Sequence, residues 1–151
     1  MPNTQAMCTS FKVEILGGVH AIGTPPTRGT TAKDTFKAAL FLDSATLNAG
    51  TTVYSSSGEV SGAGYSAGGI SVSNATAPTS TGTTAYWTPS ASLTYSNVTL
   101  TTAFDAVLIY NSTQGDKAVA VYTFGSQTVT SGTFILTMPT NDASTGLLRI
   151  A

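Results

Sequence analysis

Short runs of β-forming residues, separated by turn residues, recur along most of the chain. The run Phe36–Leu42 has apolar residues on both faces, which is typical of a strand buried on both faces. Shorter runs at 51–54, 69–72, 84–87 and 98–102 predict further strands. No window has the apolar spacing of a long amphipathic helix.

The clearest pattern is AVLIYNSTQGDKAVAVYTF, in which residues 106–110 and 117–124 flank a polar connection ending in Gly115-Asp116. This arrangement predicts a β-hairpin inside a sheet. Residues 133–138 and 147–150 predict two more strands. Many short strands without long helices favour an all-β fold: a single-domain antiparallel β-sandwich or jelly roll.

Residues 1–33 have a different pattern. Phe11, Val13 and Ile15 alternate with Lys12 and Glu14, which predicts one short, half-buried strand. The stretch GTPPTRGTTAKD at 23–34 is rich in proline, glycine and threonine and predicts a linker. We therefore expect an N-terminal extended arm and linker at 1–33 and a β-sandwich domain at 34–151.

Charge is scarce in this chain of 151 residues: only 9% are charged, with six Lys or Arg, seven Asp or Glu, and a net charge of -1. Soluble domains average about 25% charged residues. There is no basic patch for nucleic acid or an anionic membrane, and no apolar run long enough to span a bilayer. A surface so weakly charged favours contact with other protein.

The stretch GEVSGAGYSAGG at 58–69 raises the question of a phosphate-binding loop. Such a loop follows a strand and opens a helix, whose N-terminal N–H groups hold the phosphate. Here a predicted strand follows, the glycine spacing differs from GxGxxG, and no Lys or Arg lies between Lys37 and Lys117. The glycines are therefore interpreted as tight bends and close approaches between backbones.

Candidate catalytic groups are few. His20 is the sole histidine and lies in the predicted arm, where no rigid scaffold would position it as a base. Cys8, the sole cysteine, also lies in the predicted arm, where no rigid scaffold would position it as a nucleophile. Asp105, Asp116 and Asp142 do not have the spacing of a metal site. We expect no catalytic residue, no cofactor and no metal site, and hence a protein that is not an enzyme.

Tyr86, Trp87 and Tyr95 have two interpretations. They form either part of the core, which is the usual place of aromatic residues in a strand-rich chain, or a platform on which a sugar stacks. The second interpretation makes the chain a carbohydrate-binding β-sandwich.

The order of segments carries a resemblance. FKAALFLDSATLNAGTTVYSSSGEVSGAGYSAGGISVSN, then TTAYW, the hairpin AVLIYNSTQGDKAVAVYTFG, GTFILTMP and LLRIA together resemble the head decoration, or capsid cement, proteins of tailed bacteriophages. The resemblance covers about residues 34 to 151, and its most specific parts are EVSGAGYSAGG and LIYN…DKAVAVYTFG. Residues 1–33 have no counterpart in it.

The resemblance implies a β-sandwich or jelly roll on the capsid surface of a virion, made in the host cytoplasm. Its implied partners are the major capsid protein and further copies of itself, as a homodimer or homotrimer. The arm residues Phe11, Val13 and Ile15 are the expected interface, added as a strand to a neighbour's sheet. A structural role in the phage neck, tail or fibre base is the alternative.

Overall fold

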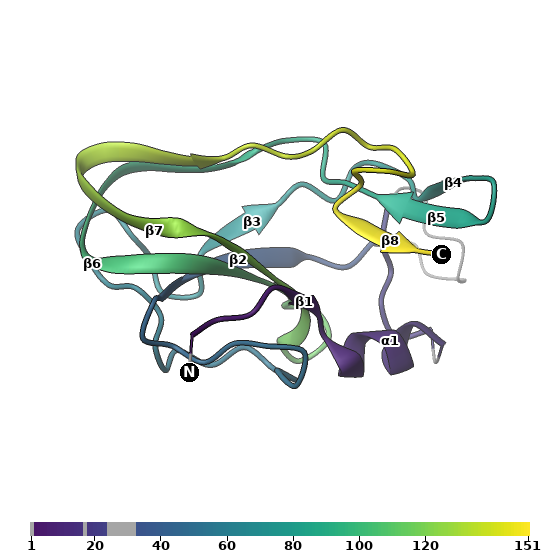
Figure 1. Cartoon of the computed structure of the whole chain (residues 1–151), viewed down its shortest axis with the longest axis horizontal. Helices are drawn as coiled ribbons and strands as arrows, with labels where there is room; N and C mark the ends of the chain where they lie inside the picture. The colour runs from purple at the N-terminus through teal and green to yellow at the C-terminus, as the bar shows by residue number, and fades with distance from the viewer. Residues whose placement is uncertain (1, 17, 24–32) are drawn as a thin grey trace.

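The computed structural model describes residues 2–16, 18–23 and 33–151, and most regular structure in them is β-strand (Figure 1). In chain order the elements are β1 (Ala6–Met7), α1 (Thr9–Leu16), β2 (Phe36–Leu42), β3 (Ile70–Val72), β4 (Thr79–Thr81), β5 (Thr84–Trp87), β6 (Leu93–Asn111), β7 (Lys117–Leu136) and β8 (Leu148–Ile150). They form a five-stranded sheet, β1-β7-β6-β2-β3, and a three-stranded sheet, β4-β5-β8. All pairs are antiparallel, so the all-β prediction is confirmed, while this strand order does not establish a jelly roll.

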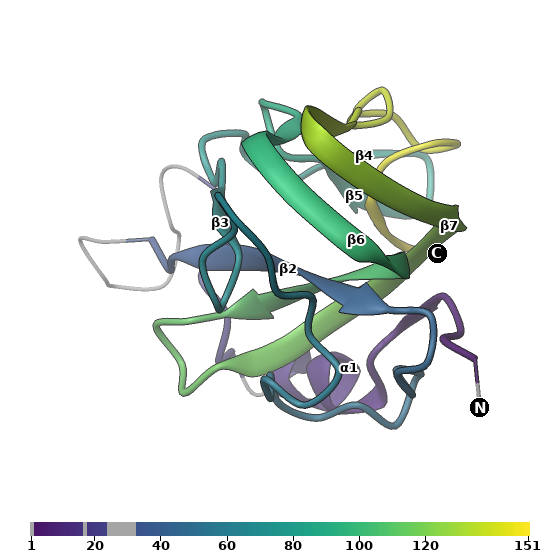
Figure 2. The ribbon, with the colours of Figure 1, turned by 90° about the vertical axis from the view of Figure 1, so that its left-hand side faces the viewer.

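β6 and β7 make one long hairpin that curves at one end of the molecule and folds back over the main sheet (Figures 1 and 2). We call residues 106–111 and 117–123 the turn half of this hairpin, and residues 93–104 and 124–136 its far half. Register shifts lie on both sides of Phe104, where the hairpin bends. Bulges of this kind bend a strand and increase its twist. One hairpin thereby supplies strands to two layers.

The core lies between these layers. From the far half, the Tyr95 hydroxyl donates a hydrogen bond to the carbonyl of Ala38 in β2, at 2.9 Å. At the bend, the Phe134 ring lies 5.0 Å from that of Phe104 and 5.4 Å from that of Phe124. Such aromatic contacts add to the stabilisation that comes from burial alone.

The glycine-rich stretch is a close-packed connection, as predicted. A Cβ atom at Gly62 would collide with the carbonyl oxygen of Thr99, and one at Gly69 would collide with that of Ala38. Gly69 also has a φ of 71°, which favours glycine. The strand expected after the glycines is β3.

The N-terminal segment differs from the prediction. Residues Thr9–Leu16 form helix α1, so the expected strand through Phe11, Val13 and Ile15 is wrong. Phe11 and Ile15 are four residues apart, a spacing that places both on one side of a helix. Phe11 is fully buried, Ile15 packs against the core, and Val13 is 67% exposed. Over so few residues, the alternation of a strand and the four-residue spacing of a helix both fit the same apolar residues.

This segment packs against the main sheet instead of extending from it. β1 pairs with residues 120 and 121 of β7, and the amide of Cys8 donates to the carbonyl of Val119 at 3.0 Å. Most of the predicted linker, residues 24–32, lies outside the described residues.

Candidate binding site

An apolar hollow of about 240 Å³ lies between the N-terminal segment and the three-stranded sheet. Phe11 and Ile15 of α1 line one side, and residues of β5 and β8, among them Trp87 and Ile150, line the other. A cavity of roughly 150 Å³ holds a benzene molecule, so this hollow has room for one or two apolar side chains. Two of the three predicted interface residues thus line a hollow, and Val13 does not.

A row of rings joins the two walls. The Phe11 ring lies 4.8 Å from His20, His20 lies 6.4 Å from Phe36, and Phe36 lies 6.2 Å from Trp87. The Trp87 indole N–H donates to the carbonyl of Thr76 at 2.9 Å, which fixes the ring in the wall. The walls are therefore held by the core itself.

A cluster of polar side chains anchors α1 beside the hollow. The Glu14 carboxylate accepts from the Lys117 ammonium group at 2.7 Å and contacts the Nε2 atom of His20 at 2.8 Å. The His20 side chain is fully buried, whereas that of Lys117 is 39% exposed. Lys117 starts β7, so this contact ties the helix to the hairpin turn.

The partners of Asn111 assign the tautomer of His20. The Asn111 Oδ1 atom accepts from the amides of Thr113 at 3.1 Å and Gln114 at 3.2 Å, so its Nδ2 atom faces the other way. Nδ2 donates to His20 Nδ1 at 2.9 Å. Nδ1 is therefore the acceptor, and the proton on Nε2 is donated to Glu14. With both ring nitrogens engaged and the side chain buried, His20 has no nitrogen free to act as a base.

Two carboxylates of this cluster are held in their charged form. Burial alone would raise the pKa of Glu14, but hydrogen bonds from Lys117 and His20 lower it below its ordinary value. Burial likewise opposes the charge of Asp34, but bonds from the Ala21 amide, Asn111 and Gln114 lower its pKa. The cluster fixes the N-terminal segment and gives the hollow no reactive group.

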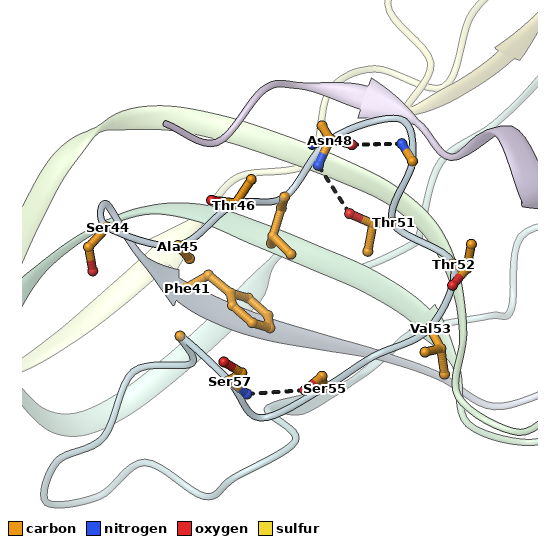
Figure 3. A pocket seen from close by; sticks show the side chains of 13 residues that line it. Phe41, Ser44, Ala45, Thr46, Asn48, Thr51, Thr52, Val53, Ser55 and Ser57 are labelled. Carbon is orange, nitrogen blue, oxygen red and sulfur yellow. Dashed lines mark hydrogen bonds between the residues drawn. The ribbon is translucent and has the colours of Figure 1, made fainter. Parts of the chain in front are cut away.

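A wider hollow, of about 600 Å³, lies along the loop after β2 (Figure 3). Its polar side chains hold the loop's own backbone: Asn48 Oδ1 accepts from the Gly50 amide at 2.8 Å, and Thr51 Oγ1 accepts from the Asn48 amide at 3.0 Å. None of the residues lining it is acidic or basic. Its lining therefore offers hydroxyl groups and no acid or base.

The other candidate residues lie mainly in the core. Trp87 and Tyr95 are only 3% and 2% exposed, so the three aromatics do not form a sugar-stacking platform. Cys8 is fully buried, and burial, followed by the charge of Glu14, raises the pKa of its thiol to about 11. Within residues 2–16, 18–23 and 33–151, no three His, Cys, Asp or Glu side chains gather as a metal site.

Comparisons with known proteins add no relative. No protein-family model, curated protein or solved structure matches the chain. None of the helices in the described part of the chain is long and apolar enough to cross a lipid bilayer. The apolar hollow between α1 and β8 is the site on which we base a function.

Proposed function

We propose that this chain is a non-enzymatic structural protein of a tailed-phage virion. It binds the outside of the assembled capsid and stabilises the junctions between major capsid protein subunits. The resemblance of residues 34 to 151 to head decoration proteins supports this role. The observation that carries it is the apolar hollow, because an apolar hollow in a weakly charged chain suits a protein partner.

The edge of the small sheet supports docking at this hollow. β8 is the last strand in the order β4-β5-β8, and it is the strand of that sheet nearest α1 (Figure 1). Ile150, at 51% exposed, lies in the hollow's lining. A capsid strand added to β8 would form main-chain hydrogen bonds and place a large apolar side chain in the hollow.

The lining also selects the partner's chemistry. Apart from His20, no acidic or basic residue lines the hollow, and both ring nitrogens of His20 are engaged within the protein. A charged side chain entering the hollow would lose its water without gaining a partner. The capsid segment is therefore uncharged where it docks.

Stabilisation follows from mass action. A protein that binds the assembled shell, and not its separate subunits, lowers the free energy of the shell by its own binding free energy. The contact recurs at every equivalent junction, so a modest interface has a large summed effect. No chemical step is required.

The direct test is the number of copies per particle, measured by quantitative mass spectrometry of virions of the encoding phage. The expected result is a ratio to the major capsid protein near one, or a simple fraction of it. A handful of copies per particle would assign the chain to the neck or tail instead. Absence from particles would refute a virion role.

The site is tested by co-sedimentation with shells of the cognate capsid protein. Ile150→Asp puts a charge in the hollow, and Val53→Asp is the matched control because Val53 is 47% exposed and does not line the hollow. We expect Ile150→Asp to weaken binding at least tenfold and Val53→Asp to leave it unchanged. Equal binding by both variants would exclude the hollow as the capsid-binding site.

A further inference from the structure

The far half of the hairpin has an open edge. β7 ends the main sheet except where β1 pairs with residues 120 and 121. In the described part of the chain, residues 124–136 pair with β6 on one side and with no strand on the other. In Figure 2 this part of β7 is the outermost strand of the ribbon. A row of unpaired N–H and C=O groups is a template for another strand.

This edge has no charged residue and no proline to block pairing. No Asp, Glu, Lys, Arg or His lies between Lys117 and Asp142, or between Leu93 and Phe104 on the neighbouring strand. Natural edge strands are commonly blocked by lysine, proline or a bulge. Register shifts interrupt the pairing of residues 124–132 with β6, and Ser131, with a φ of 48°, lies at one of them; beyond them, residues 134–136 pair regularly with β6.

Apolar side chains lie on both faces of this edge strand. Ile135, within that regular stretch, is 54% exposed. A second apolar hollow, of about 190 Å³, lies beside β7. It is lined by Tyr122 and Phe124 near the bend of the hairpin and by Leu136 at the end of the strand. An unpaired edge, an exposed isoleucine and an apolar hollow therefore occur together on β7.

From these features we infer that two copies of this chain pair through the β7 edge. Residues 134–136 of each copy lie antiparallel to those of the other about a two-fold axis, with the two Ile135 residues directly opposed. A two-fold contact places every group against its own equivalent, so a charged edge would repel itself. The uncharged β7 edge meets this condition, and a second copy is the partner to which its chemistry is complementary.

The first test measures the dimer by sedimentation across a wide range of protein concentration. Ile135→Lys should raise the dimer dissociation constant at least tenfold, because it removes an apolar contact and sets two positive charges face to face. Thr94→Lys is the matched control, since Thr94 pairs with Ile135 and is exposed on the same face, one strand in from the edge. A wild-type chain that stays monomeric, or a dimer that Ile135→Lys leaves intact, would overturn the inference.

The second test fixes the register. Cys8 is fully buried, so Ile135→Cys supplies a single accessible thiol. Directly opposed residues of antiparallel strands are close enough for a disulfide, and we expect mild oxidation to link Ile135→Cys chains into dimers. Thr94→Cys should remain unlinked. Equal linking of both variants, or linking of neither, would refute the pairing.

This inference stands apart from the proposed function. The β7 edge and the hollow beside β8 belong to different sheets. We therefore expect a monomeric Ile135→Lys chain to retain capsid binding through β8, with reduced avidity. Loss of capsid binding by Ile150→Asp with an intact dimer would show that the two surfaces act separately.

Discussion

The two halves of the β6–β7 hairpin share the same strands and differ in how many faces are covered. In the turn half, residues 106–111 and 118–121 are all buried. In Figure 1 the far half lies over one face of this part of the sheet, and α1 and the loop after β2 lie on its other side. In the far half, buried Leu93 and Tyr95 alternate with exposed Thr94 and Ser96. A continuous apolar sequence therefore indicates a strand that is covered on both faces, and alternating apolar and polar residues indicate a strand that is covered on one face.

Charge follows the same division. The turn half carries Asn111 and Lys117, which join the Glu14–His20–Asp34 cluster. The far half has no ionisable acid or base apart from buried Tyr95. Electrostatic stabilisation is thus confined to one end of the hairpin, and the other end depends on packing and hydrogen bonds.

The largest difference in stability between the two halves is expected when an apolar side chain is truncated in each. Leu108→Ala, at a fully buried position of the turn half, should lower the free energy of unfolding by about 2–5 kcal/mol through the cavity it leaves. Ile135→Ala, at an exposed position of the far half, should change that of the monomeric chain by less than about 0.5 kcal/mol. Urea denaturation of both variants measures the difference, and equal losses would show that the far half is covered as well.

Asn111→Ala tests the polar end of the turn half. The variant removes one of the donors to Asp34, the donor to His20 Nδ1, and the acceptor of the amides of Thr113 and Gln114. Buried polar groups left unpaired cost about 1–3 kcal/mol, so a loss in this range is expected in urea. The exposed Thr101→Ala, in the far half, is the control and should be neutral. A neutral Asn111→Ala would mean that water satisfies the cluster.

Tyr95→Phe tests the bond that joins the halves. It removes the hydroxyl that donates to Ala38 and leaves the buried ring in place, so we expect a loss of about 1 kcal/mol. Tyr86→Phe, whose hydroxyl makes an exposed contact with Thr81, should cost less. If both variants unfold at the same urea concentration, the bond to Ala38 does not hold the halves together.

The smallest effect is expected from acid. The pKa of Glu14 is lower in the folded chain than its ordinary value of 4.5, so its contribution to stability is complete well above pH 4.5. That contribution is lost as the pH falls through the lower, folded value. The unfolding free energy of Glu14→Gln should therefore change less than that of the wild type over this range. Parallel pH profiles would show that Glu14 is not held by its partners.

The strands that are covered on both faces are predicted well from the sequence. β2 was predicted with its observed bounds because seven successive residues suit a strand buried on both faces. The sequence predicts the turn half because two apolar runs flank a polar connection that ends in Gly115-Asp116, and in the structure both of these residues have a positive φ. The far half was read as separate short strands, because bulges at Asn97 and Ser131 interrupt the alternation.

The candidate site was much less predictable. Phe11 and Ile15 were chosen correctly as apolar residues of interest, but on a strand where a helix forms. Their counterparts across the hollow, Trp87 and Ile150, are far away in the sequence, and so is Asn111, which contacts His20. No local spacing rule links such residues, since only the folded chain brings them together.

The position of the hollow has a consequence for biosynthesis. Its walls come from residues 7–22, 78–87 and 148–150, so one wall is made early and another late in translation. Ribosomes add roughly 5–20 residues per second, and chains begin to fold from their N-terminal end as they emerge. The wall formed by residues 7–22 therefore lacks its opposite wall until residue 150 has left the ribosome. A chain that has emerged only as far as β5 has no complete hollow, so the docking that we propose requires residue 150 to have emerged.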